Sequence, residues 1–323
     1  MRKTPAILAA TALVLTLAAC AAPSGPAVDG GSALDAASCA PVWQRGGIAA
    51  GVTSTGDFGT TPVDPSFPVP LISHDRDSSA FIHVGDGAIV GPSDIVAGTI
   101  TLVDGATGML LDQTATTVYL PLAGASPLFD AAVCAPVGSR IAAVGTTESI
   151  LGAGVVTQNG LDPQQTLVAI IDVQDAFISR AQGPSLPPLN GLPSVSLAAN
   201  GQPGLSFTNA TPPADLRIET LIQGSGTTVA EGDTVLLNYT GVNWNTRTVF
   251  DTSWERGAPA QFATTAVVDG FGQALVGQQV GSQVLVSIPP AYGYGDNPPT
   301  GSGIGATDTI VFVIDILGVL PAA

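Results

Sequence analysis

The run TIVFVIDIL, from Thr309 to Leu317, is the part of the chain richest in β-branched residues, and it predicts a buried strand. Two shorter runs rich in Val, Leu and Ile, Thr234–Thr240 and Gln283–Ile288, are bounded by Gly, Asp and Pro and predict two more strands. Between them, Val268–Val276 has the apolar spacing of about two helical turns. Strands with one short helix predict an α+β fold, in which an antiparallel sheet packs one face on the helix.

The polar residues of this stretch exclude several kinds of enzyme. Residues 235–312 contain no Cys and no His, so nucleophilic catalysis has no obvious machinery. No group of residues has the spacing of metal ligands, and nothing indicates a cofactor. Aromatic and aliphatic side chains with a few acids remain, and one acid, Asp251, directly follows an aromatic residue. This composition predicts an apolar cleft in which a few polar groups fix the orientation of a ligand.

Spaced motifs in this stretch resemble those of a known family. Tyr239-Thr240-Gly241, Val249–Ser253 (VFDTS) and Ala291–Gly295 (AYGYG) follow one another, with Val267–Phe271 (VVDGF) and Gly281–Val284 (GSQV) between the last two. In this order and at these separations they resemble the FKBP-type peptidyl-prolyl cis-trans isomerases. The resemblance covers roughly the last third of the chain. It implies an antiparallel sheet half-wrapped around a short helix.

The resemblance also implies roles for individual residues. Apolar side chains would form the walls and floor of a pocket for a proline ring: Tyr239, Phe250, Val267, Val268, Phe271 and Phe312. Asp251 would place its carboxylate at the pocket edge near the amide carbonyl carbon, and Arg256 would pair with that acid. Tyr294 would donate a hydrogen bond to a substrate carbonyl. Ile304 lies in the loop that would overhang the cleft.

Some positions depart from the family. Ala260 stands where a Phe is frequent, and Phe271 stands where Trp is the commonest floor residue. The loop 296–307 is rich in Gly and Pro and matches the overhang only loosely. These departures bear on substrate preference more than on the basic activity. Taken singly, Phe250, Phe271 and Phe312 are compatible with an ordinary core, so the prediction depends on the whole set.

The implied reaction needs no covalent catalyst. Its barrier, about 18–20 kcal/mol, is the loss of amide resonance as the C–N bond twists. A dry pocket that fits the twisted amide better than the planar one lowers this barrier by differential binding. The resemblance therefore implies proline-containing polypeptides as substrates, macrolides as inhibitors and no cofactor.

The beginning of the chain predicts export. Two basic residues precede an apolar run, Ala6–Ala19, that is too short to span a membrane. The run ends in Leu17-Ala18-Ala19-Cys20, which resembles a bacterial lipobox and implies cleavage before Cys20 and lipid attachment to it. We expect residues 1–19 to be a signal peptide and 20–38 a flexible tether, with the protein lipid-anchored at the extracytoplasmic face of the cell membrane. The alternative is an ordinary secretory signal with a chance cysteine.

The charge of the chain excludes one class of partner. Its formal net charge is −16 at pH 7. A protein this acidic is repelled by nucleic acid and by anionic lipid headgroups. We therefore expect no nucleic-acid partner, and we expect the membrane to be reached through the lipid.

Two cysteines remain once Cys20 is assigned to lipidation. Cys39 and Cys134 form an even pair in a protein expected to be exported to an oxidising location. We expect a disulfide between them. Two buried free thiols are the alternative.

The chain contains an internal repeat. Asp94-Ile95-Val96 matches Asp233-Thr234-Val235 at a shift of 139 residues, and Val137-Gly138-Ser139 matches Val280-Gly281-Ser282 at a shift of 143. A nearly constant shift with one step indicates two copies of a fold that differ in one loop. A length of 323 residues also fits two domains.

We therefore expect two tandem FKBP-like domains, residues 39–180 and 191–323, joined by a Pro-rich linker at 181–190. The first copy has smaller or aliphatic residues opposite the aromatic pocket positions: Ile100, Leu111, Leu128 and Ala169. We expect it to be a structural or binding module.

Three functions remain open at this point. The first is an isomerase that assists the folding of exported proteins. The second is a non-catalytic chaperone or scaffold that binds unfolded chains, which Ala260 and the altered overhang favour. The third is a surface-exposed binding lipoprotein whose ligand uses the first domain.

Overall fold

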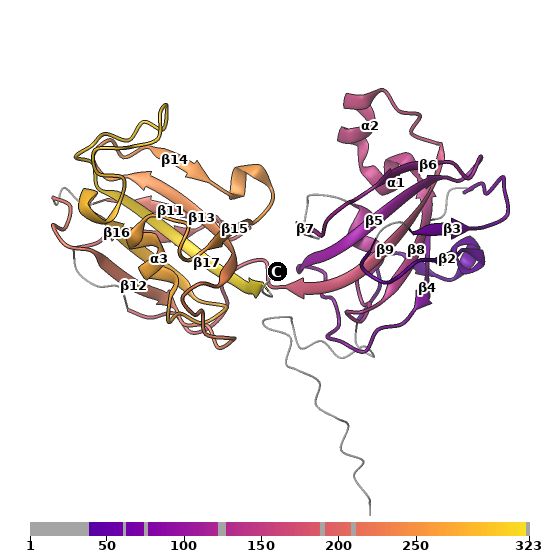
Figure 1. Ribbon diagram of the computed structural model, residues 1–323, viewed down its shortest axis with the longest axis horizontal. Coiled ribbons are helices and arrows are strands. Elements are labelled where there is room, and N and C mark those ends of the chain that lie inside the picture. The colour runs from indigo at the N-terminus through magenta and orange to yellow at the C-terminus, as the bar shows by residue number, and fades with distance from the viewer. Residues whose placement is uncertain are drawn as a thin grey trace, which may run out of the picture.

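The computed structural model describes residues 39–60, 63–73, 77–121, 127–187, 191–207 and 211–320. The expected signal peptide, Cys20 and the tether lie outside these residues. The described chain forms two large, mainly antiparallel sheets and two small hairpins, with few helices (Figure 1). The α+β fold class expected from the sequence is confirmed. Among the residues described, no helix has the length and apolar character that a membrane crossing requires.

The carboxyl-terminal sheet contains the strands expected from the three β-rich runs. Its strands are β12 (Arg217–Ile222), β13 (Thr234–Asn243), β14 (Val249–Thr252), β15 (Ala260–Ala263), β16 (Gln283–Ile288) and β17 (Ile310–Leu320). Their order is β12-β16-β17-β13-β14, and β15 also pairs with β13. The β-branched strand β17 lies between β16 and β13 and is buried along almost its whole length.

The amino-terminal sheet repeats this order. Its strands are β1 (Gln44–Arg45), β4 (Ser78–His83), β5 (Ile95–Asp104), β6 (Leu110–Gln113), β7 (Val118–Pro121), β8 (Arg140–Thr146) and β9 (Thr166–Phe177). The order β4-β8-β9-β5-β6, with β7 paired to β5, corresponds strand for strand to the second sheet. Only the short β1, parallel to β4, is an addition. The two halves of the chain therefore share one topology.

Each half also has a small hairpin outside its main sheet. The hairpin of the first half pairs β2 (Thr53–Thr55) with β3 (Asp64–Ser66), and that of the second pairs β10 (Ser194–Leu197) with β11 (Pro203–Ser206). Phe207, which follows β11, packs edge-on against Trp244 with ring centroids 5.2 Å apart. The second hairpin thus covers the face of the sheet opposite the helix.

The helices differ between the halves. In the second half, α3 (Asp269–Leu275) packs on β16 and buries Phe271 and Leu275. The negative charge of Asp269 in the first turn stabilises the helix, because it lies at the positive end of the helix dipole. The first-half counterpart of α3 is also a short helix, but of the 3-10 type: η2 (Pro127–Ala132). The first half also has α1 (Thr147–Leu151) and α2 (Ala153–Asn159) between β8 and β9. The remaining 3-10 helices are η1 (Gly47–Gly51), η3 (Trp254–Arg256) and η4 (Pro290–Tyr292).

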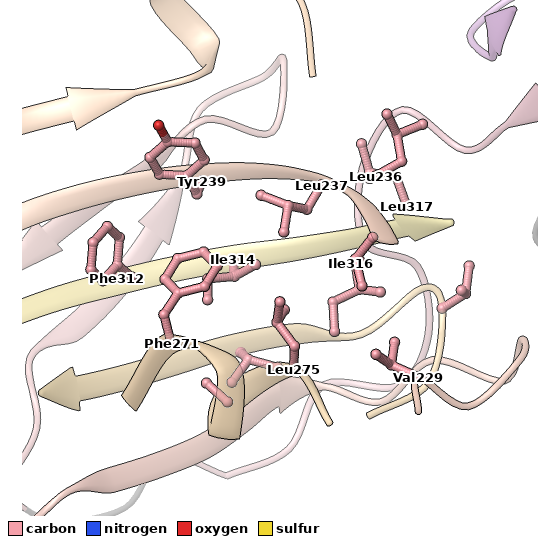
Figure 2. Close-up of a cluster of buried hydrophobic side chains, with 14 of the residues drawn as sticks. Val229, Leu236, Leu237, Tyr239, Phe271, Leu275, Phe312, Ile314, Ile316 and Leu317 are labelled. Atoms are coloured by element: carbon pink, nitrogen blue, oxygen red, sulfur yellow. The ribbon is translucent and has the colours of Figure 1, made fainter. Parts of the chain in front are cut away.

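The core of the second half continues into the first. Figure 2 shows side chains of β13, β17 and α3 in one buried cluster, with Tyr239, Phe271 and Phe312 at one end and Leu236 and Leu317 at the other. Buried residues of the first half belong to the same cluster: Ile95, Ala97, Phe177 and Ile178. The ends of β9 and β17 meet between the two sheets (Figure 1). The halves therefore touch through an apolar contact.

The segment that follows β9 is hydrogen-bonded to the second half. The amide of Ala181 donates to Oδ2 of Asp315 at 2.9 Å, and the amide of Gln182 donates to the carbonyl of Gly281 at 2.8 Å. The amide of Leu186 donates to the carbonyl of Leu221 at 2.8 Å. Residues 181–186, part of the expected linker, therefore lie along the second sheet.

A disulfide ties the first described residue to the first core. Cys39 is bonded to Cys134, 95 residues further along the chain, with the Cα atoms 5.6 Å apart. Both cysteines pack against the apolar cluster of the first half. A bond that closes so long a loop restricts the unfolded chain strongly.

We predict that replacing both cysteines, Cys39→Ala with Cys134→Ala, lowers the free energy of unfolding of the first half by about 3 kcal/mol. Urea unfolding followed by circular dichroism measures this change. A reducing agent should lower the midpoint of the wild type and leave that of the double variant unchanged. Equal sensitivity of both proteins to the reductant would contradict the prediction.

Candidate active site

A cleft of about 440 Å³ opens at one end of the second sheet. Strands β13, β14, β15 and β17, helix α3 and the loops after β15 and η4 supply its walls. Its lining residues are Tyr239, Phe250, Asp251, Phe262, Ala266, Val267, Val268, Phe271, Tyr294 and Phe312. All six residues expected as pocket walls are present, together with the two expected catalytic residues.

Aromatic rings form the floor and walls of the cleft. Phe271 and Phe312 are buried and meet edge to face, with ring centroids 4.9 Å apart and planes 89° apart. Phe250 contacts Phe312 in the same way at 5.5 Å. Tyr239 lies 6.1 Å from Phe312 and 6.3 Å from Phe271. Such edge-to-face contacts hold the rings in fixed orientations and leave an apolar surface open to the cleft.

The packing around Gly241 explains why the motif Tyr239-Thr240-Gly241 ends in glycine. It pairs with Phe312 on β17 and with Asp251 on β14. A Cβ atom at this position would lie 2.7 Å from ring carbons of both Phe250 and Phe312. Only glycine lets the two rings meet over the strand.

The carboxylate of Asp251 lies at the edge of the cleft and has two partners. The hydroxyl of Tyr239 donates to Oδ2, and Nη1 of Arg256 donates to Oδ1 at 2.5 Å. Nη2 of Arg256 also donates to the hydroxyl oxygen of Tyr239 at 2.9 Å, and its guanidinium lies 5.4 Å from the centre of the Tyr239 ring. Asp251 and Arg256 remain 42% and 49% exposed, so substrate and solvent can reach the pair.

This network sets the protonation states. Burial raises the pKa of Asp251, but the hydrogen bonds from Tyr239 and Arg256 outweigh burial and hold it below its ordinary value. Burial and the hydrogen bond to Asp251 raise the pKa of Tyr239 to about 12. At neutral pH, Asp251 is therefore an anion and Tyr239 a neutral phenol.

Tyr294 and Ile304 come from the segment between β16 and β17. Tyr294 follows η4 and lines the cleft, and burial, followed by the negative charge of Asp251, raises its pKa. Its hydroxyl is therefore a neutral donor at neutral pH. Ile304 is half-buried and packs against the apolar core, but it does not line the cleft. The loop expected to overhang the site thus contributes less to it than the resemblance implied.

Sequence reasoning missed Phe262 and Ala266. Phe262 lies on β15, two residues after Ala260, and alternate residues of a strand share a face. Its ring lies 5.6 Å from that of Tyr239 and 5.8 Å from that of Phe271. A large ring therefore stands on the same strand face as Ala260, which occupies a position where a Phe is frequent in the family. The alternation Ala-Gln-Phe was the signal that could have identified it.

The counterparts of the pocket residues in the first half are mostly buried apolar side chains. Ile100, Leu128 and Ala169, which replace the aromatic pocket residues, share one buried cluster with Ile150 of α1. Ile150 is fully buried. Leu111, the counterpart of Phe250, is 45% exposed on β6 instead of facing a cleft. Among the described residues, the first half therefore has aliphatic side chains in its core where the second has the aromatic rings of the cleft.

Comparisons with known proteins agree with this geometry. Residues 225–317 match the family described as FKBP-type peptidyl-prolyl cis-trans isomerase. An FK506-binding protein of Streptomyces anulatus is 38% identical over 120 residues, which are 36% of this chain and 97% of that protein. The chain belongs to the FKBP-type peptidyl-prolyl cis-trans isomerase family. Its second half is accordingly an isomerase domain.

Two more distant similarities each cover about two fifths of the chain. The outer membrane protein MIP of Legionella longbeachae is 32% identical over 130 residues, which are 39% of this chain and 55% of that protein. The crystal structure of FkpA from Escherichia coli matches with a TM-score of 0.31 and 28% identity, over 40% of this chain and 53% of that one.

We predict that Phe262→Ala lowers kcat/KM of the isomerase about tenfold, because it removes a ring that supports Tyr239 and Phe271. The rate of cis-to-trans exchange in a short proline peptide measures this. Phe81→Ala makes the same truncation on the surface of the first half and should leave the rate unchanged. Equal rates for the two variants would show that Phe262 does not shape the site.

The pKa shifts predict a flat pH profile. With Asp251 ionised and Tyr239 neutral, kcat/KM should be constant from about pH 5 to about pH 9. Arg256→Ala removes one hydrogen bond to Asp251 and the positive charge beside it, which raises the pKa of Asp251 and moves the acid loss of activity to higher pH. An acid limb at the same pH in the wild type and the variant would exclude this role of Arg256.

Proposed function

We propose that this protein speeds the isomerisation of X-Pro bonds in exported polypeptides, and that the cleft of its second half holds the twisted amide. The roles assigned from the sequence are part of this proposal. Asp251 and Tyr294 act on the amide, and the aromatic side chains hold the proline ring. The observation that carries the proposal is an ionised carboxylate at the open edge of a cleft walled by phenylalanine rings.

The chemistry follows from the polarity of the amide. A planar amide is stabilised by resonance, which separates charge and is favoured by water. In the cleft the rings of Phe250, Phe271 and Phe312 exclude water around the proline. The twisted amide is less polar than the planar one, so it loses less solvation free energy when it leaves water. As resonance is lost, the carbonyl carbon becomes more electron-poor, and the carboxylate of Asp251 stabilises it. The Tyr294 hydroxyl donates a hydrogen bond to a substrate carbonyl and holds the chain in register.

Arg256 and Tyr239 act on Asp251 and keep its carboxylate oriented. Each donates to a different oxygen, so the carboxylate is fixed without being neutralised. Fixing a charged group in advance avoids the cost of orienting it during the reaction. Macrolides that bind the family are expected to enter the same cleft.

The location and domain limits belong to the proposal as well. A signal peptide at 1–19, lipidation at Cys20 and a tether at 20–38 would hold the protein at the extracytoplasmic face of the membrane. The domains would span 39–180 and 191–323, with the first a non-catalytic module. The similarity to outer membrane protein MIP of Legionella longbeachae supports a membrane-associated role.

The direct test measures isomerisation with the full mature chain. We predict measurable acceleration of a short proline peptide, with Asp251→Ala lowering kcat/KM about a hundredfold and Tyr294→Phe about tenfold. A macrolide that blocks this family should abolish the acceleration. Full activity in both variants would contradict the assigned roles.

A second function, binding of unfolded chains, is favoured by one observation. The exposed residues at and before β6 are apolar: Met109, Leu110 and Leu111 are 62%, 55% and 45% exposed. Edge strands with exposed apolar side chains can bind extended polypeptides. If the Asp251→Ala variant suppresses the aggregation of unfolded chains as well as the wild type does, binding is separate from catalysis, and this second function is supported.

A further inference from the structure

The turn that carries Arg256 is held from outside the region that matches the family. Arg256 lies in η3, three residues after Ser253, and its amide donates to the carbonyl of Ser253 at 3.1 Å. The guanidinium is half-exposed, and its described partners are Asp251 and the hydroxyl and ring of Tyr239. Its position therefore depends on how firmly the backbone of residues 253–256 is held.

A chain of hydrogen bonds connects this turn to the segment between the two sheets. The carbonyl of Ser179 accepts from Nδ2 of Asn238 at 3.2 Å. Oδ1 of Asn238 accepts from the hydroxyl of Ser253 at 2.8 Å, and Oγ of Ser253 accepts from the amide of Tyr239 at 3.0 Å. Asn238 is 8% exposed and Ser253 is fully buried, so water competes little with these bonds.

A second connection runs through Gly201. This glycine lies in the turn between β10 and β11, between Trp254 of η3 and the side chain of Arg180. A Cβ atom there would lie 3.1 Å from Cη2 of Trp254 and 3.3 Å from Cδ of Arg180. Arg180 also donates to the carbonyl of Ala199 in the same turn at 3.4 Å. The hairpin turn, Arg180 and Trp254 therefore form one packed contact.

The two connections, through Asn238 and through Gly201, end at the neighbouring residues Ser253 and Trp254. Ser179 acts through Asn238 on Ser253, and Arg180 acts through Gly201 on Trp254. Neither Ser179, Arg180 nor Gly201 lies within residues 225–317. In the first half the segment is shorter: residues 114–117 connect β6 to β7, whereas residues 253–259 connect β14 to β15. The first half, whose counterparts of the aromatic pocket residues are aliphatic, thus has a shorter connection in place of this turn.

We propose that the segment at Ser179 and Arg180 and the hairpin turn at Gly201 are positioning elements of the isomerase, which hold Ser253 and Trp254 so that Arg256 reaches Asp251. This inference rests on the proposed role of Asp251. It means that the region preceding the matched domain takes part in setting the active site. The residues act through Arg256 and do not touch the substrate.

Gly201→Ala tests the proposal in the full chain. Gly201 has φ +97°, and the added methyl must also displace Trp254 or Arg180. Gly232→Ala is the matched control, because Gly232 has φ +92° and nothing lies within 4 Å of its Cβ position. Both glycines have a similar positive φ, so a difference between the variants reports the contact with Trp254 and Arg180.

Two readouts separate positioning from folding and from catalysis. In Gly201→Ala the carboxyl carbon of Asp251, followed by NMR, should titrate at higher pH than in Gly232→Ala. The kcat/KM of Gly201→Ala should fall about threefold to tenfold, while Gly232→Ala stays within about twofold of the wild type. Trp254→Ala removes the same contact from the other side and should reproduce both the shifted Asp251 titration and the lower kcat/KM. This second variant tests the proposal even where Gly201→Ala does not fold.

The outcomes are distinct. An Asp251 titration in Gly201→Ala and Trp254→Ala that equals the control would overturn the positioning role, whatever the activity. A shifted titration without any isomerase activity in the wild type would support the positioning role and count against the proposed catalytic function instead.

Discussion

The carboxylate of Asp251, shared between the hydroxyl of Tyr239 and the guanidinium of Arg256, is the interaction on which the site depends. A lone carboxylate beside phenylalanine rings would tend to take up a proton, because burial disfavours its charge. Two donors reverse this tendency while each leaves part of the anion accessible. The strand pairing that makes this arrangement possible places Gly241 opposite both Asp251 and Phe312, so the acid and the floor of the cleft meet across one glycine.

The two halves show how one topology can carry different side chains at the same positions. Where the second half has the aromatic rings of its cleft, the first has Ile100, Leu128 and Ala169, which belong to one buried apolar cluster. A buried aspartate occupies the same place in both sheets. In the first half Asp172 pairs with Arg140 and accepts the amide of Gly59, which ties down the hairpin loop. In the second half Asp315 accepts hydrogen bonds from the side-chain amide of Gln283 and from the backbone amide of Ala181. The same position therefore attaches the segment that joins the halves.

The sequence was enough to predict the parts that depend on local pattern. The β-branched run of β17, the strands β13 and β16 and the helix with Phe271 follow from periodicity, and the pocket residues follow from spaced motifs. Phe262 was not predicted as a pocket residue, because β15 has only four residues and its pattern was too short to interpret alone. The short helix expected in the first half is present as η2, and its 3-10 geometry is a detail that the expectation did not specify. The contact of Gly201 with Trp254 joins residues distant in sequence, and no local pattern encodes such a contact.

A crystal structure of the chain with a bound X-Pro peptide tests the central claim most directly. The account predicts the proline ring against Phe271, between Phe250, Phe312 and Tyr239, with Asp251 still paired to Arg256 at its edge. A peptide bound with its proline outside this cleft, or with Asp251 turned away from the amide and released by Arg256, would contradict it.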